Sequence, residues 1–202
     1  MHLWAFMAIA IVIIVVPGPD MALVTRNALL FGRGPALATA LGVCTGLTVW
    51  TVASAFGVAA VIHASAIAFT VLKLAGGAYL VWLGIEALRT AGRHAELPPR
   101  RPVDGARGFR QGVTSNLANP KIAVVFTSLV PQFVDPGEPL LVPFLVLGSI
   151  FVALTLAWLC AYAVAASRAS GILQRPRVRR ALDRLTGVVL IALGLRLATE
   201  RR

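Results

Sequence analysis

Two long stretches without a charged residue constrain this chain more than any other feature. Residues 34–72 and residues 139–167 contain no Asp, Glu, Lys or Arg. About 20 such residues cross the hydrocarbon core of a bilayer as a helix, so each stretch is long enough to span a membrane. Composition agrees, because 58% of the residues are hydrophobic and only 13% are charged, against roughly 25% charged in a typical soluble domain. The sequence therefore predicts an all-α, polytopic membrane protein.

The apolar segments divide the chain into six predicted transmembrane helices. The 39 residues of 34–72 must hold two of them, because a single helix of that length would measure about 58 Å, nearly twice the hydrocarbon thickness. The polar break His63-Ala64-Ser65 separates the two. The first segment is predicted as a helix rather than a secretory signal, since no Lys or Arg precedes it and no A-x-A site follows it. The predicted helices are 3–25, 35–62, 65–87, 110–133, 139–166 and 183–199.

Basic residues indicate how these helices are oriented. Of the 19 Lys and Arg residues, 14 lie in the segments 26–33, 89–110 and 168–184, and three, Arg196, Arg201 and Arg202, lie at the C-terminal end of the sixth helix and after it. A positive excess marks the cytoplasmic side, so we expect the first, third and fifth loops in the cytoplasm and both termini outside. The net charge of +11 is therefore explained by the orientation of the protein in the lipid bilayer, and no nucleic-acid partner is predicted. Contact of the basic loops with anionic lipid head groups is a further expectation.

Two sequence matches relate the halves of the chain. The segment Pro19–Val24 aligns with Pro120–Val125, and Gly77–Ile85 aligns with Gly187–Leu195. Because each half holds three helices, an odd number, the second half must enter the membrane from the opposite side. We therefore predict a single transmembrane domain, 1–202, made of two inverted three-helix repeats. The repeats are about 3–87 and about 110–199, and a cytoplasmic linker of about 88–109 joins them.

Prolines break the first helix of each predicted repeat. The breaks are Pro17-Gly18-Pro19 and Asn119-Pro120, where proline removes backbone donors. A broken backbone at membrane depth is tolerated where it is buried in protein or lines a wet cavity. In transporters built from inverted repeats, such helices form the substrate site near the midplane. The alternative is that these kinks serve packing alone.

Ionisable residues adjoin both breaks. Asp20 and Lys121 are aligned by the repeat, and Lys73 lies in the third predicted helix. Charges inside membrane helices are costly and usually mark a substrate or ion path. A carboxylate combined with one or two ammonium groups suits a zwitterion, although a structural ion pair between Asp20 and Lys121 is an alternative. The predicted substrate-binding or coupling residues are Pro17, Gly18, Pro19, Asp20, Lys73, Asn116, Asn119, Pro120 and Lys121.

Three motifs in this order resemble the lysine-exporter (LysE/RhtB-type) translocator family. They are Pro17-Gly18-Pro19-Asp20, the segment from Lys73 to Gly84, and Phe109-Arg-Gln-Gly112 leading to 116–121. The resemblance implies a bacterial inner-membrane carrier that works as a homodimer and needs no cofactor. It also implies export of amino acids or close derivatives, similar to homoserine, threonine or lysine, coupled to the proton motive force.

Three other functional classes are alternatives to an exporter. A membrane enzyme is disfavoured because the chain has no H-E-x-x-H or G-x-S-x-G motif, so no catalytic residue is predicted. A thiol-disulfide electron carrier would place cysteines at the breaks, whereas Cys44 and Cys160 lie in the second and fifth predicted helices. A metal-ion exporter would need a cluster of His and carboxylate ligands inside the bundle, which the sequence lacks, so no metal site is predicted.

Overall fold

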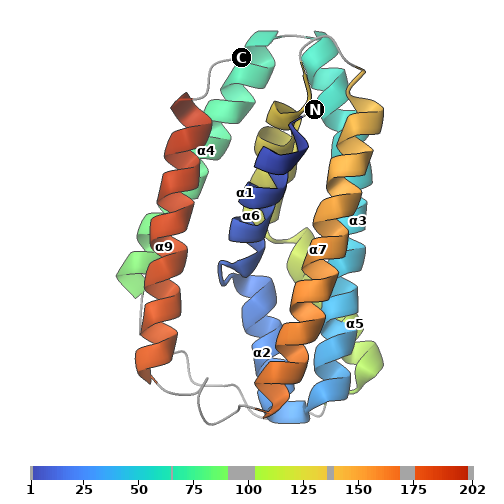
Figure 1. The fold of residues 1–202 in the computed structure, drawn as a ribbon, viewed down its shortest axis with the longest axis vertical. Helices are drawn as coiled ribbons and strands as arrows, with labels where there is room; N and C mark the ends of the chain where they lie inside the picture. Colours follow the sequence, from blue (N-terminus) through green and yellow to red (C-terminus); the bar gives the residue numbers. More distant parts are fainter. Residues whose placement is uncertain (1, 65, 91–102, 136–138, 169–175, 200–202) are drawn as a thin grey trace.

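Long helices run roughly along one direction in the computed structural model of this protein (Figure 1). The structure describes residues 2–64, 66–90, 103–135, 139–168 and 176–199. In these ranges every regular element is helical. The elements are α1 (Leu3–Val15), α2 (Pro19–Phe31), α3 (Arg33–Ala64), α4 (Ala66–Thr90), α5 (Gly105–Leu117), α6 (Pro120–Val124), the π-helical turn η1 (Val125–Leu129), the 3-10 turn η2 (Val130–Phe133), α7 (Leu141–Arg168) and α9 (Pro176–Thr199).

The long uncharged stretch 34–72 forms two helices, as predicted. Helix α3 ends at Ala64 and α4 begins at Ala66, so the break falls at the predicted polar tripeptide. The first predicted helix is instead two helices, α1 and α2, whose axes differ by 48°. Helix α2 continues beyond the predicted end at residue 25 and ends at Phe31. Gly32 follows it with a φ of 83°, a backbone conformation that residues other than glycine rarely adopt.

Two helices in the second half begin before the approximate starts of the predicted spans. The fourth helix starts at Gly105 rather than 110, because the Asp104 side chain caps it by accepting the Arg107 N–H at 2.8 Å. The sixth starts at Pro176 rather than 183, with a proline at the first helical position, where it is well tolerated. The first turns of this helix contain several arginines and therefore lie outside the apolar pattern. A criterion based on the absence of charge places the start of the helix too late for this reason.

Length and apolar composition identify candidate membrane spans within the described residues. Helix α3, over Arg33–Gly57, and helix α7, over Leu141–Arg168, each meet both requirements. The bent pair formed by α1 and α2 can serve as a third span. Large apolar side chains also lie exposed on the bundle, including Trp4 at 82% and Ile67 at 78%, which fits a lipid-facing surface.

Glycines allow close helix crossings at two places in the bundle. Helix α3 packs against α5 and α7, and α4 packs against α9. Where α3 crosses α5, a side chain on Gly42 would collide with the backbone of Phe109. Between α4 and α9, a side chain on Gly84 would lie 2.6 Å from the carbonyl oxygen of Gly187. These glycines therefore allow the close helix approach on which tight packing depends.

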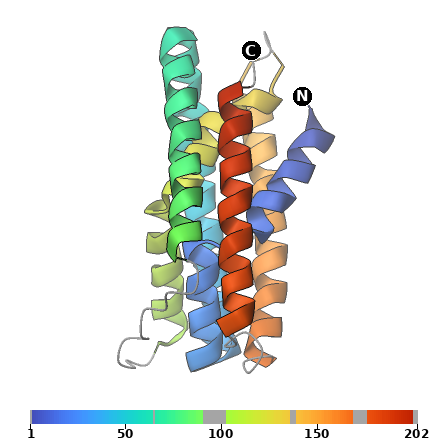
Figure 2. The same cartoon turned by 90° about the vertical axis from the view of Figure 1, so that its left-hand side faces the viewer.

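Helices α1 and α2 run through the middle of the view, with α4 and α9 on one side and α3, α5 and α7 on the other (Figure 1). In the view from the side, the upper part of α1 leans away from the remaining helices (Figure 2). Helix α2 packs against α3, α5 and α7. The break between α1 and α2 therefore lies inside the bundle, where the second break can reach it.

Candidate functional site

Two interrupted helices meet in the interior of the bundle. Pro19 and Pro120 occupy the first turns of α2 and α6, where the missing N–H of proline has little cost. Asn119 caps α6, since its side-chain oxygen accepts the Lys121 N–H at 3.1 Å. Each break therefore leads into a helix whose second residue is ionisable, Asp20 in one and Lys121 in the other.

The Asp20 carboxylate is bound by side chains from the other break. Asp20 is 9% exposed and lies in the first turn of α2. Its Oδ1 accepts a hydrogen bond from Ser115 Oγ at 2.8 Å. Its Oδ2 accepts from Asn116 Nδ2 at 2.8 Å and from Asn119 Nδ2 at 2.9 Å. Three neutral donors thus compensate for the burial of this carboxylate.

The Lys121 amine is bound by the end of α1. Lys121 is 8% exposed, and its Nζ donates to the carbonyl oxygens of Ile13 and Val16, both at 3.3 Å. The Ile13 carbonyl is available because its helical donor would be the N–H of residue 17, which is a proline. Gly18 leaves room for the amine, since a Cβ at that position would lie 3.1 Å from Lys121 Nζ.

Each charged group is therefore held by the opposite break. The Lys121 amine binds carbonyls that carry the negative end of the α1 dipole, and Asp20 binds amide and hydroxyl donors. The structure records no ion pair between these two fully described side chains. The direct ion pair between Asp20 and Lys121 that was the alternative is therefore not formed in this structure.

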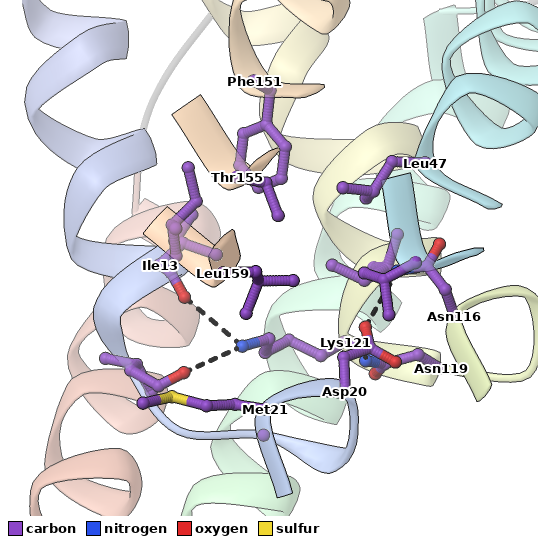
Figure 3. A pocket seen from close by; sticks show the side chains of 15 residues that line it. Ile13, Asp20, Met21, Leu47, Asn116, Asn119, Lys121, Phe151, Thr155 and Leu159 are labelled. Carbon is purple, nitrogen blue, oxygen red and sulfur yellow. Dashed lines mark hydrogen bonds between the residues drawn. The ribbon is translucent and has the colours of Figure 1, made fainter. Parts of the chain in front are cut away.

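A small cavity of about 40 Å³ lies between the two breaks and α7 (Figure 3). Asp20, Asn116, Asn119 and Lys121 line one part of it, and apolar side chains, among them Leu47, Phe151 and Leu159, line the rest together with Thr155. About 10–15 Å³ of such volume is enough for one water molecule. The cavity in this conformation therefore has room for a few water molecules and is smaller than an amino acid.

The structure brings together five of the nine predicted site residues around this cavity: Gly18, Asp20, Asn116, Asn119 and Lys121. Pro17, Pro19 and Pro120 shape the backbone of the breaks from which those side chains extend. Lys73 is buried on α4 at 8% exposure but is not among the residues that line the cavity.

Sequence reasoning missed two polar residues of the site. Ser115 donates a hydrogen bond to the Asp20 carboxylate. Its position next to Asn116, near the end of α5, was the sequence feature that could have identified it as a site residue. Thr155 lines the cavity from the middle of α7. A single hydroxyl in a long apolar helix gives no signal of this kind in the sequence.

The cysteines and possible metal ligands lie apart from the two breaks. Cys44 on α3 and Cys160 on α7 are free thiols, and neither lines the cavity. Within the described ranges, no three His, Cys, Asp or Glu side chains are close enough together to hold a metal ion. The chemistry concentrated at the breaks is therefore that of one carboxylate, one amine and several neutral hydrogen-bonding groups.

Comparisons with known proteins find membrane proteins that cover nearly the whole chain. The chain is 31% identical over 185 residues to a homoserine/homoserine lactone efflux protein of Salmonella typhimurium, covering 92% of this chain and 90% of the relative. It is 30% identical over 213 residues to a threonine efflux protein of Escherichia coli K12, covering 98% and 100%. It is 29% identical over 208 residues to an uncharacterized membrane protein, YrhP, of Bacillus subtilis, covering 97% and 98%. No solved structure matches the chain.

The family model for the LysE type translocator matches residues 11–201, which is nearly the full length of the chain. The match includes both helix breaks, the cavity between them and the crossing of α4 with α9. A translocator is a transport protein rather than an enzyme, which agrees with a site that holds charged and polar groups but no reactive constellation. This membrane protein belongs to the LysE type translocator family.

Proposed function

We propose that this protein exports a small amino acid from the cytoplasm and that the cavity between the two helix breaks is its substrate site. The observation that carries the proposal is that Asp20 and Lys121, two buried side chains from different halves of the chain, line one cavity. A zwitterion offers an ammonium group to the carboxylate and a carboxylate to the amine. The names of the relatives, which are homoserine or threonine efflux proteins, support amino-acid export.

Six transmembrane spans in two inverted repeats are part of this proposal. The first repeat comprises α1 with α2, α3 and α4, and the second comprises α5 through η2, α7 and α9. Helices α4 and α9 have 25 and 24 residues, enough to cross a bilayer. The glycines that face each other support the symmetry. In the sequence alignment Gly77 matches Gly187 and Gly84 matches Gly194, while in space Gly77 meets Gly194 and Gly84 meets Gly187. Reciprocal contacts of this kind are what a two-fold axis between two repeats produces.

The proposed location is the bacterial inner membrane, with both termini outside. In support, the end of α2, the start of α5, the end of α7 and the start of α9 lie at one end of the bundle (Figure 1). These helix ends carry many of the basic residues, including Arg26, Arg107, Arg168 and Arg180. The positive-inside rule assigns this end to the cytoplasm. A homodimer, which the family resemblance implies, stays a prediction.

Protons are the proposed coupling ion, and Asp20 is the group that would carry them. It is the one carboxylate among the described residues that line the cavity. A proton and the substrate ammonium compete for this carboxylate, so protonation from outside would release the amino acid there. Lys121 would bind the substrate carboxylate, with the uncharged donors Asn116 and Asn119 beside it.

Substrate entry requires the bundle to open, because the cavity of about 40 Å³ is too small for an amino acid. Side-chain hydrogen bonds close α2 against its neighbours on the proposed cytoplasmic side. Thr25 Oγ1 lies 2.9 Å from the hydroxyl oxygen of Tyr162. Asn27 Nδ2 donates to Thr39 Oγ1 at 2.8 Å and to Gln111 Oε1 at 3.2 Å. We infer that these contacts break when the site opens to the cytoplasm.

The direct test of the proposed function is efflux from preloaded cells across a panel of amino acids, with the gene deleted or overexpressed. Overexpression should speed the loss of at least one small amino acid, and a protonophore should abolish this gain.

The double variant Cys44→Ala with Cys160→Ala should export normally, because neither thiol lines the cavity. No change in efflux for any amino acid would contradict the proposal. Loss of activity in the double variant would favour a thiol-disulfide carrier, and export of metal ions alone would favour the metal-ion alternative.

A further inference from the structure

Thr155 has a different hydrogen-bonding state from eight other helical threonines of the described residues. In the described part of the chain, eight other threonines donate their hydroxyl to the carbonyl four residues earlier, the usual partner inside a helix. Thr155 lies in the middle of α7, is 7% exposed, and its hydroxyl has no partner in the structure. The eight are Thr25, Thr39, Thr45, Thr48, Thr51, Thr114, Thr127 and Thr199.

The position of Thr155 places this buried hydroxyl at the candidate substrate site. Thr155 lines the cavity together with Phe151 and Leu159, its neighbours on the same face of α7. In the close view, Thr155 and Phe151 lie on one side of the cavity, and Lys121 and Asp20 lie on the other (Figure 3). A buried hydroxyl without a partner is unfavourable, so its retention at this place points to a partner that enters the cavity.

The surroundings of Thr155 limit what that partner can be. Asp20 and Lys121 are the ionisable groups among the described residues lining the cavity, and both are assigned to the backbone charges of an amino acid under the proposed function. The α7 side then faces the substrate side chain with Phe151, Leu159 and one hydroxyl. No second carboxylate is present among these lining residues for a cationic side chain such as that of lysine. The wall fits a short, neutral side chain that carries a hydroxyl group.

We propose that Thr155 Oγ1 forms a hydrogen bond with the side-chain hydroxyl of a short hydroxy-amino acid and sets the preference of the exporter for such substrates. This inference rests on the proposed function. The Thr155 hydroxyl both donates and accepts, as does the substrate hydroxyl, so the two satisfy each other inside the bundle. An apolar substrate of the same shape would leave the Thr155 hydroxyl unpaired. Recognition of this type discriminates against a substrate that lacks the hydroxyl.

The experiment compares isosteric substrate pairs in liposomes that contain the purified protein. Counterflow of threonine is measured against valine, and homoserine against norvaline, for the wild-type protein and three variants. We expect the wild type to prefer the hydroxyl member of at least one pair by about tenfold. Thr155→Val should bring that ratio close to one, mainly by raising KM for the hydroxyl substrate, while Thr155→Ser should preserve it. The matched control is Thr51→Val on α3, because Thr51 is 3% exposed and donates its hydroxyl to the Leu47 carbonyl at 2.8 Å.

The outcomes separate this inference from the proposed function. A wild-type protein that transports amino acids without preferring the hydroxyl member of either pair overturns the role of Thr155. The same conclusion follows if Thr155→Val keeps the preference, or if Thr155→Ser loses it in a protein of normal thermal stability. If Thr155→Val does not fold, the wild-type ratio and the Thr155→Ser ratio decide. Absence of transport for every amino acid by the wild type would instead contradict the proposed function itself.

Discussion

Asp20→Asn will abolish proton-driven net efflux of the transported amino acid while exchange across the membrane continues. The carboxylate accepts three hydrogen bonds from Ser115, Asn116 and Asn119. An asparagine cannot take up a proton, and its NH₂ group would face donors rather than acceptors. With no group left to take up protons at the site, we expect proton-driven net efflux to fall to the background of liposomes that lack the protein. The measurement is net efflux and substrate exchange in the same liposome preparation.

The matched control for this prediction is Asp104→Asn. Asp104 is an exposed N-cap residue of α5, and asparagine caps a helix about as well as aspartate. This variant should export at the wild-type rate. Normal net efflux in Asp20→Asn would remove Asp20 as the coupling residue. Loss of both net efflux and exchange at a normal protein level would indicate that Asp20 binds substrate without coupling it to protons.

Lys121→Met will raise the KM for the transported amino acid by about 100-fold, the range expected for losing a charged hydrogen-bonding partner. It will also destabilise the protein, because the carbonyls of Ile13 and Val16 lose their charged donor inside the bundle. Lys121→Arg should restore KM poorly, because a guanidinium needs more room than an amine. The space around the amine is limited, since a Cβ on Gly18 would lie 3.1 Å from Lys121 Nζ. The measurements are the substrate dependence of counterflow and the thermal unfolding of the purified protein.

Arg110→Met provides the comparison for Lys121→Met. Arg110 lies in the same interrupted segment, on α5, but its side chain is exposed. Removing this cation should leave KM and thermal unfolding unchanged. An unchanged KM in Lys121→Met would show that the amine does not bind the substrate carboxylate. A drop in stability without a change in KM would leave Lys121 with a structural role at the end of α1.

The overall helical layout could be predicted from the sequence because its signals are local. The charge-free stretch 34–72 is too long for one span, and the polar residues at 63–65 supplied the break between α3 and α4. Prolines marked the two interruptions for the same reason, since the missing N–H acts on its own helix. The ends of the helices were harder to predict, because arginines such as Arg177 lie outside the apolar pattern but inside a helix.

The partners of the charged residues could not be predicted, because they depend on how helices are rotated against one another. The repeat indicated that Asp20 and Lys121 occupy equivalent places, but not that each binds the other break. Lys73 met the same criterion of a charge inside an apolar segment, yet it lies on α4 away from the cavity lining. Thr155 is one of several threonines in apolar helices, and only its contacts distinguish it.

Membrane topology tests most directly whether two inverted three-helix repeats bring the two helix breaks together. The measurement uses reporter fusions in the segment 90–107 and after Arg202, in cells that express the full chain. We expect fusions at 90–107 to report the cytoplasm and fusions after Arg202 to report the outside, because an odd number of spans inverts the second repeat. A cytoplasmic reporter after Arg202 would contradict two inverted repeats, since one proposed span, α9 first of all, would then not cross the membrane.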